Sequence, residues 1–246
     1  IINTKVLGLV NKECIIAGGN LIKKLCLLHK TKLYALDSEH FSIQNFFKKP
    51  SNNIKNIKNL YLTASGGPFL NKKFDLIKNV SFKKAINHPK WKMGYKNSID
   101  SATLANKCLE IIEAHYLFKL SYDKLNIIIH PESLIHSIIE FKNYTSSLNY
   151  FYHDMFIPLY NFFAYSAKID KFPFFKKKFE FNHVNSLNFF KPDMKKYPIL
   201  KIFNQIDKSK FINLIKFNCA NEFAVNLFAE KKINFGNIHR IILDSL

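Results

Sequence analysis

The sequence predicts a chain that begins with an α/β unit, continues as a mixed α+β region and ends in helices. Two short apolar segments, residues 6–10 and 33–36, flank a helical stretch at 14–29, which is typical of a strand–helix–strand unit. Further short apolar segments occupy the middle of the chain. Beyond residue 191 the apolar spacing is helical.

Composition bounds the class of protein. The chain has 246 residues, 48% of them hydrophobic, which is enough to bury a substantial core. It carries no secretory signal pattern and no apolar run long enough to cross a bilayer. Its four cysteines are scattered, which favours reduced thiols in a cytosol-like compartment over a disulfide framework or a zinc site.

The formal net charge of +19 has two explanations. A basic surface can bind nucleic acid or anions. Alternatively, the abundance of Lys, Asn, Ile, Phe and Tyr reflects A/T-rich codons. Arg240 is the only arginine, and nucleic-acid readers depend on arginine for bidentate contacts. We therefore expect no nucleic-acid partner, although the charge would help to attract an anionic substrate.

Polar residues directly follow both apolar segments of the first unit. After the first come Asn11, Lys12 and Glu13, and after the second come Asp37, Ser38, Glu39 and His40. Open α/β sheets bind ligands at such strand ends. In extended backbone, residues two apart point the same way, so Asp37 and Glu39 would offer two oxygens to one cation. A polar loop after a strand explains the same residues.

A third strand is expected at 60–63, leading into Ser65 and two glycines. Glycines let the backbone approach a ligand, and the Ser65 hydroxyl can hydrogen-bond a phosphate, although a plain turn has the same composition. Residues 88–94 include the only tryptophan, Trp91. This segment either covers a bound ligand or anchors a loop to the core.

The stretch from Asp100 to residue 118 contains no Gly or Pro and predicts a helix, with Asp100 and Ser101 as N-cap residues. Four polar side chains share one arc of it: Asn106, Lys107, Glu110 and Glu113. The arc is either a solvated face with ion pairs or a pocket wall. As a wall, it would hold an anion near the helix N-terminus and a metal ion at Glu110.

Later segments complete the expected elements. Strands are expected at 125–129 and 137–141, and helices at 199–206 and 218–230. His130 and His136 lie between these strands without the spacing of a metal site.

Six motifs, taken in order, closely resemble those of one family, 1-deoxy-D-xylulose 5-phosphate reductoisomerase of the non-mevalonate isoprenoid pathway. They are Asn11-Lys12-Glu13, Asp37-Ser38-Glu39-His40, Ser65-Gly66-Gly67-Pro68-Phe69, His88-Pro89-x-Trp91-x-Met93-Gly94, Asp100-Ser101-Ala102-Thr103-x-x-Asn106-Lys107-x-x-Glu110-x-x-Glu113 and His130-Pro131-x-Ser133-x-x-His136. Each motif alone is weak. The ordered set is specific and covers essentially the whole chain.

The resemblance implies an NADPH-dependent oxidoreductase that uses Mg²⁺ or Mn²⁺. It would isomerise 1-deoxy-D-xylulose 5-phosphate and reduce it to 2-C-methyl-D-erythritol 4-phosphate. By matching position, the metal ligands would be Asp37, Glu39 and Glu110, an all-oxygen set that such cations prefer. The catalytic residues would be Lys12, Glu39, His88 and Glu110. The substrate would be held by Lys12, Ser38, Glu39, Ser65, His88, Ser101, Asn106, Lys107 and Glu110. Positions near NADPH would be Asn11, Glu13 and Gly94.

The resemblance also implies an organisation and a setting. The fold class would be α/β followed by α+β, in four parts: the end of an NADPH-binding domain (1–36), a catalytic, metal-binding and dimerisation domain (37–165), a linker (166–190) and a truncated C-terminal helical domain (191–246). The partners would be a sugar phosphate and a second copy of the chain, with no membrane. The location would be a bacterial cytoplasm or a plastid stroma.

The chain also departs from the family's pattern. No Gly-x-Gly-x-x-Gly follows a strand, so the chain is either a fragment or has lost NADPH binding. Cys108 replaces a Gly, and Leu104-Ala105 replaces Met-Met of many members. No predicted metal ligand is missing. The alternative interpretation is a degenerate, non-catalytic remnant of the family.

Overall fold

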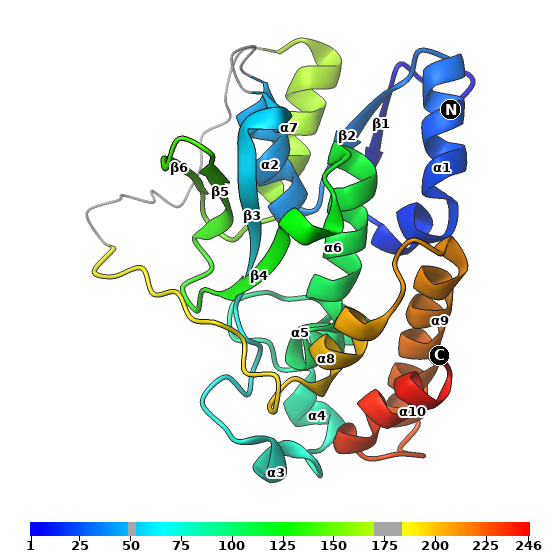
Figure 1. Ribbon diagram of the computed structural model, residues 1–246, viewed down its shortest axis with the longest axis vertical. Helices are drawn as coiled ribbons and strands as arrows, with labels where there is room; N and C mark the ends of the chain where they lie inside the picture. Colours follow the sequence, from blue (N-terminus) through cyan, green and yellow to red (C-terminus); the bar gives the residue numbers. More distant parts are fainter. Residues whose placement is uncertain (49–52, 170–183) are drawn as a thin grey trace.

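The computed structural model describes residues 1–48, 53–169 and 184–246, and Figure 1 shows how their elements are arranged. The predicted α/β unit is confirmed, and it consists of β1 (Val6–Leu9), α1 (Lys12–Leu28) and β2 (Lys32–Ala35). The two strands are parallel, with Val6 opposite Lys32 and Leu9 opposite Ala35. Parallel strands end at the same edge of a sheet, so the segments after β1 and β2 meet there.

A four-stranded sheet forms the centre of the molecule. In spatial order it contains β4 (Leu125–Ile129), β3 (Ile57–Ala64), β5 (Ile135–Phe141) and β6 (Ser146–Tyr150). β3 is parallel to β4 and antiparallel to β5. β4 has the predicted bounds, whereas β3 and β5 are longer than predicted, and β6 was not expected as a strand.

The predicted helix from residue 100 to 118 is instead two helices. α5 (Tyr95–Thr103) ends at Leu104, whose left-handed φ of 65° separates it from α6 (Ala105–Phe118). The prediction that Asp100 and Ser101 cap the helix was therefore wrong, because both lie in α5. Leu104 is only 1% exposed. Burial of its side chain offsets a left-handed conformation that costs roughly 1–2 kcal/mol.

The expectation of an extended backbone at Asp37–Glu39 was also wrong. Asp37 is the N-cap of α2 (Ser38–Phe47), and its side chain accepts a hydrogen bond from the Glu39 N–H at 3.2 Å. An aspartate before an apolar run is a helix-start signal, and Phe41 and Ile43 of that run are buried. Capping, rather than strand alternation, directs these carboxylates.

The described part of the chain contains further α-helices. They are α3 (Phe74–Ile77), α4 (Phe82–Ala85), α7 (Phe156–Ala167), α8 (Pro198–Gln205), α9 (Phe211–Ala229) and α10 (Ile238–Asp244). The two predicted C-terminal helices are confirmed as α8 and α9, although α9 begins earlier than predicted, and α10 was missed. Of the predicted linker at 166–190, residues 170–183 lie outside the described part of the chain, while Phe190 pairs with Ile129 of β4.

The core is organised around α6, which runs between the four-stranded sheet and α1 (Figure 1). Leu60 and Leu62 of β3, Leu109 and Ile112 of α6, and Phe217 of α9 are all fully buried in it. α9 packs against α1, α5 and α6. Within the described residues, no helix combines the length and apolar character needed to cross a membrane.

Candidate active site

The ends of four elements converge on one cavity of about 190 Å³. Lys12 follows β1, Asp37 follows β2 and Ser65 follows β3. The fourth contribution is the start of α6, where Asn106 and Lys107 lie in the first turn. Leu104, the left-handed residue before α6, sets the direction of this turn, which faces the strand ends. Residues far apart in sequence thus meet in one wall.

The structure brings together all ten residues predicted to be catalytic, metal-binding or substrate-binding. The cavity lining contains Lys12, Asp37, Ser38, Glu39, Ser65, His88, Ser101, Asn106, Lys107 and Glu110. It also contains Trp91 and Met93 of the segment predicted either to cover a ligand or to anchor a loop. The helix arc that carries Lys107 and Glu110 is therefore a pocket wall and not a solvated face.

Two lysines and three carboxylates form the charged centre of the cavity. Lys12 Nζ lies 2.9 Å from Asp37 Oδ2 and 3.3 Å from Glu110 Oε1. Lys107 Nζ lies 2.6 Å from Glu39 Oε1 and 2.7 Å from Glu110 Oε2. Glu110 also accepts a hydrogen bond from the amide of Asn106. Each lysine thus bridges two carboxylates, and Glu110 is shared by both.

Burial governs the protonation of these groups. Burial and the nearby Glu39 raise the pKa of Glu110 to about 7, although Lys107 and Lys12 oppose the shift. Burial would also raise the pKa of Asp37, but Lys12 and His40 hold it well below its usual range. Crowded carboxylates of this kind gain stability from added positive charge. The centre is therefore suited to bind a further cation.

The donor set is suited to a hard divalent cation. Asp37, Glu39 and Glu110 each offer a carboxylate oxygen, and these oxygens lie within 4.8 Å of one another. Three carboxylates without a thiolate or imidazole match the preference of Mg²⁺ and Mn²⁺ for oxygen ligands.

A hydrogen-bonded pair defines the proton positions beside the Gly-Gly turn. The backbone N–H groups of Lys90 and Trp91 donate to His88 Nδ1 at 3.2 and 2.9 Å. His88 Nε2 must then carry the ring proton and donate to Ser65 Oγ, 2.9 Å away. Burial and the charge of Lys107 lower the pKa of His88 to about 4, so the ring is neutral. Because Ser65 Oγ also accepts from the Gly67 N–H at 3.1 Å, its own proton is left to donate to a ligand.

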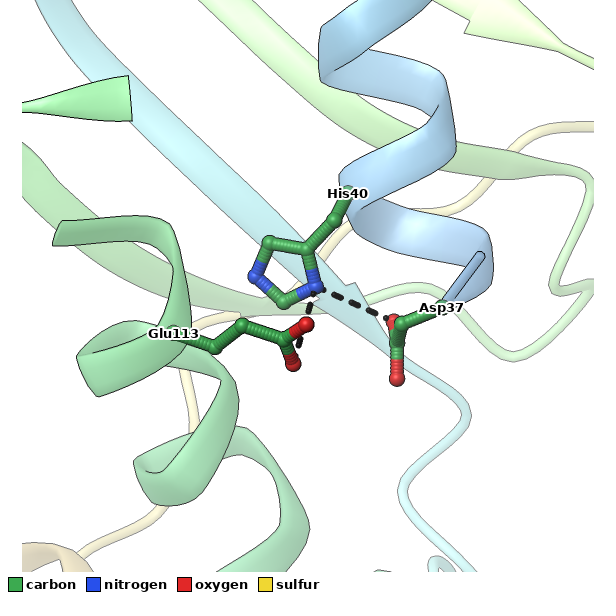
Figure 2. A group of neighbouring side chains, drawn as sticks. All are labelled: Asp37, His40 and Glu113. Carbon is green, nitrogen blue, oxygen red and sulfur yellow. Dashed lines mark ion pairs between the residues drawn. The ribbon is translucent and has the colours of Figure 1, made fainter. Parts of the chain in front are cut away.

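A second layer supports the carboxylates from behind, and Figure 2 shows its three residues. His40 Nδ1 lies 3.3 Å from Asp37 Oδ1 and 3.4 Å from Glu113 Oε2. His40 Nε2 lies 3.0 Å from the Glu110 carbonyl oxygen. Burial lowers the pKa of His40, but Glu113 and Asp37 raise it to about 9. The imidazolium therefore links α2 to α6. Glu113, the fourth residue of the predicted arc, faces His40 and does not line the cavity.

The three residues matched to cofactor positions lie outside the cavity lining. Asn11 caps α1 by accepting a hydrogen bond from the Cys14 N–H at 2.9 Å. Glu13 is held by Lys96 at 2.7 Å. Gly94 precedes α5, and a Cβ atom there would meet nothing within 4 Å. The structure thus gives Asn11 a local capping contact and ties Glu13 to Lys96 of α5.

Several lining residues were not singled out from the sequence. They include Thr63, Asn97 and Met155. Asn97 lies four residues before Ser101 on α5, and residues so spaced share a helix face. Correct placement of the α5 start would have identified it.

Comparison with known proteins identifies the family. A model of the 1-deoxy-D-xylulose 5-phosphate reductoisomerase C-terminal domain matches residues 33–118, and a model of the DXP reductoisomerase C-terminal domain matches residues 152–246. The chain is 42% identical over 243 residues to the 1-deoxy-D-xylulose 5-phosphate reductoisomerase of Sulfurihydrogenibium sp. (strain YO3AOP1). It belongs to the 1-deoxy-D-xylulose 5-phosphate reductoisomerase family. The resemblance of the six motifs is therefore confirmed.

The chain matches only part of its reductoisomerase relatives. The alignment with the Sulfurihydrogenibium protein covers 98% of this chain and 62% of that protein. The reductoisomerase of Clostridium kluyveri is 40% identical over 238 residues, covering 97% of this chain and 60% of that protein. The chain thus spans about 60% of the length of these curated relatives.

Solved reductoisomerase structures share the fold. A crystal structure of DOX-P reductoisomerase in complex with NADPH, fosmidomycin and magnesium matches with a TM-score of 0.88 at 34% identity, covering 97% of this chain and 60% of that one. The Zymomonas mobilis enzyme in complex with NADPH matches with a TM-score of 0.85 at 32% identity, covering 98% of this chain and 62% of that one. The mixed α/β architecture is thus that of the family.

Proposed function

We propose that this chain forms the metal- and substrate-binding part of an NADPH-dependent 1-deoxy-D-xylulose 5-phosphate reductoisomerase. The enzyme would isomerise and reduce its substrate to 2-C-methyl-D-erythritol 4-phosphate. One observation carries the proposal: three clustered carboxylates share a small cavity with ammonium, amide and hydroxyl donors. The carboxylates suit a divalent cation, and the donors suit a phosphate.

The metal would be held by Asp37, Glu39 and Glu110. Bound there, Mg²⁺ or Mn²⁺ would supply Lewis-acid polarisation of the substrate's carbonyl and hydroxyl oxygens. Lys12 already contacts Asp37 and Glu110, so its ammonium group is placed to donate to a substrate oxygen beside them. Ser38 and Glu39, at the start of α2, would contact the same part of the substrate.

The phosphate end of the substrate would bind to Ser65, Ser101, Asn106 and Lys107. The Ser65 hydroxyl proton is free to donate, because His88 and Gly67 both donate to its oxygen. Asn106 and Lys107 lie in the first turn of α6, where the helix dipole favours an anion. Trp91 and Met93, with His88, would cover the substrate and exclude water.

NADPH would approach from the side of Asn11, Glu13 and Gly94. A fosmidomycin, magnesium and NADPH complex of a relative supports this set of ligands. The Gly-rich dinucleotide-binding segment would belong to the part of the relatives that this chain does not span. The intact carboxylate cluster favours this enzyme over a non-catalytic remnant.

A second copy of the chain is the proposed partner. β6 forms one edge of the four-stranded sheet, and an edge strand offers unpaired backbone groups to another chain. A monomeric mass for the full-length protein in solution would overturn this. The relatives named above are bacterial, which supports a bacterial cytoplasm over a plastid.

A Mn²⁺ titration followed by electron paramagnetic resonance tests the proposed function. We expect Mn²⁺ to bind the full-length protein, and to bind more tightly with fosmidomycin present. Glu110→Gln should abolish this binding, because the variant loses one of three anionic ligands. Glu230→Gln is the matched control, since Glu230 lies outside the cavity at the C-cap of α9, is exposed and pairs with Lys232. Folded wild-type protein that binds no Mn²⁺ would favour the remnant.

A further inference from the structure

A chain of polar contacts joins three helices behind the cavity. Asn221 of α9 donates from Nδ2 to Asp100 Oδ1 of α5 at 2.9 Å. Lys96, one turn before Asp100, donates to Asp100 Oδ2 at 2.8 Å. The same ammonium group donates to Glu13 Oε1 of α1 at 2.7 Å. The contacts thus run from α9 through α5 to α1.

Three of the residues in this series of polar contacts are sequence neighbours of cavity residues. Glu13 follows Lys12, Lys96 precedes Asn97, and Asp100 precedes Ser101. Successive helical side chains point about 100° apart. The polar contacts therefore fix one side of the helical turns in α1 and α5, and the other side of the same turns lines the cavity.

Two of the residues in these contacts are fully buried, so loss of a contact leaves a polar group away from water. Asp100 and Asn221 are both 0% exposed, so the carboxylate of Asp100 depends on protein donors and not on water. Burial lowers the pKa of Lys96, but Asp100 and Glu13 raise it above its usual value. Burial raises the pKa of Glu13, but Lys96 brings it below its usual value. Lys96 and Glu13 are thus both charged at neutral pH.

We propose that Asn221, Asp100, Lys96 and Glu13 are positioning residues that fix α5 and the start of α1, so that Ser101, Asn97 and Lys12 face the substrate. The inference rests on the proposed function and extends it, because it gives helix α9 a role in substrate binding. α9 contributes no residue to the cavity lining. Its effect passes through Asp100 on α5, whereas the three proposed metal ligands lie at the start of α2 (Asp37 and Glu39) and on α6 (Glu110).

The test measures two affinities of the full-length protein. Mn²⁺ affinity is measured by electron paramagnetic resonance without fosmidomycin, and fosmidomycin affinity by calorimetry at saturating Mn²⁺. The variants are Asn221→Leu, which removes one donor, Lys96→Met, which removes both ion pairs, and Lys96→Arg, which restores the charge. The control is Tyr95→Phe, because the Tyr95 hydroxyl also links α5 to α9 by donating to Asn226 at 3.1 Å, at an exposed position.

We expect Asn221→Leu and Lys96→Met to weaken fosmidomycin binding about tenfold or more, since each removes hydrogen bonds to a buried charge. Their Mn²⁺ affinity should stay within about twofold of the wild type, well below the effect of one lost charged hydrogen bond. Lys96→Arg should recover most of the fosmidomycin affinity, and Tyr95→Phe should resemble the wild type.

Three results would overturn the inference. The first is fosmidomycin affinity in both variants equal to that of Tyr95→Phe. The second is an equal loss of both affinities in folded variants, as judged by their thermal unfolding, which would indicate a purely structural role. The third is wild-type protein that binds Mn²⁺ but no fosmidomycin, in which case the proposed function fails first.

Discussion

The ammonium group of Lys107 lies 2.6 Å from Oε1 of Glu39 and so ties the first turn of α6 to the first turn of α2. The same nitrogen lies 2.7 Å from Glu110. A cation bound between these carboxylates must therefore share them with a lysine. The ammonium charge of Lys107 would strengthen the binding of a phosphate and weaken the binding of a metal ion at Glu39 and Glu110.

Replacing Lys107 should separate these two affinities. Lys107→Met should tighten Mn²⁺ binding about tenfold, because a competing charge is removed from Glu39 and Glu110. Fosmidomycin binding should weaken by at least about tenfold, since a charged donor is lost. Paramagnetic resonance and calorimetry give the two values. Lys72→Met is the control for net charge, because Lys72 is exposed and outside the cavity. Weaker Mn²⁺ binding in Lys107→Met would contradict this competition.

The His40–Glu113 pair behind the cavity should show strong energetic coupling. Both side chains are fully buried. His40→Phe removes the ion-pair partner of Glu113, and Glu113→Leu leaves His40 with Asp37 as its remaining carboxylate partner. Each should lower the free energy of unfolding by on the order of 3 kcal/mol. The double variant should lose less than the sum of the two, because no unpaired charge then remains between them. Urea unfolding of the wild type, the two single variants and the double variant gives the double-mutant cycle. Losses of unfolding free energy that simply add in the double variant would contradict the coupling.

Much of the site could be predicted because its residues lie in short ordered motifs. Lys12, Asp37 and Ser65 each follow an apolar strand, and strand ends in such sheets point to ligand sites. The break at Leu104 could not be predicted, since leucine rarely adopts a left-handed backbone and only its burial in the core explains it there. That break determines where α6 begins. The direction of the first turn of α6 thus depends on tertiary packing.

The second layer was also out of reach of sequence reasoning. His40 and Glu113 are 73 positions apart, and nothing local joins them. The link between Asn221 and Asp100 spans an even longer stretch. Asn218, Asn221 and Glu222 are recognisable as a polar group on an apolar helix. Asp100, the partner of Asn221, is brought to it only when α9 packs against α5.

Acid should destabilise the protein through His136. Burial lowers the pKa of His136 from about 6.5 to about 4, and its Nε2–H donates to the Phe151 carbonyl at 3.2 Å. Between these values the unfolded chain binds a proton that the folded chain does not. This stability is therefore complete above about pH 6.5 and is lost as the pH falls towards 4, up to about 3 kcal/mol.

The measurement is urea unfolding of the wild type and His136→Gln at several pH values between 4 and 7. The variant lacks the titrating ring, so its free energy of unfolding should fall less steeply with acid than that of the wild type. His29→Gln is the control, because His29 lies outside this cavity, at the C-cap of α1. Equal slopes for the wild type and His136→Gln would show that this ring does not carry the effect.

The turn after β3 should tolerate no side chain at Gly67. Its φ of +68° favours glycine, and a Cβ atom there would lie 2.8 Å from the Cα of Ala102 and 2.9 Å from the Ser101 carbonyl oxygen. Because those atoms are backbone, Gly67→Ala must push the end of α5 away from Ser65 and so separate two proposed phosphate donors. We expect fosmidomycin affinity to fall about tenfold or more and stability to fall by on the order of 1–3 kcal/mol. Gly18→Ala is the matched control, since a Cβ atom there meets only Ile22, at 4.0 Å. Unchanged fosmidomycin affinity in Gly67→Ala would show that the phosphate does not bind at this corner.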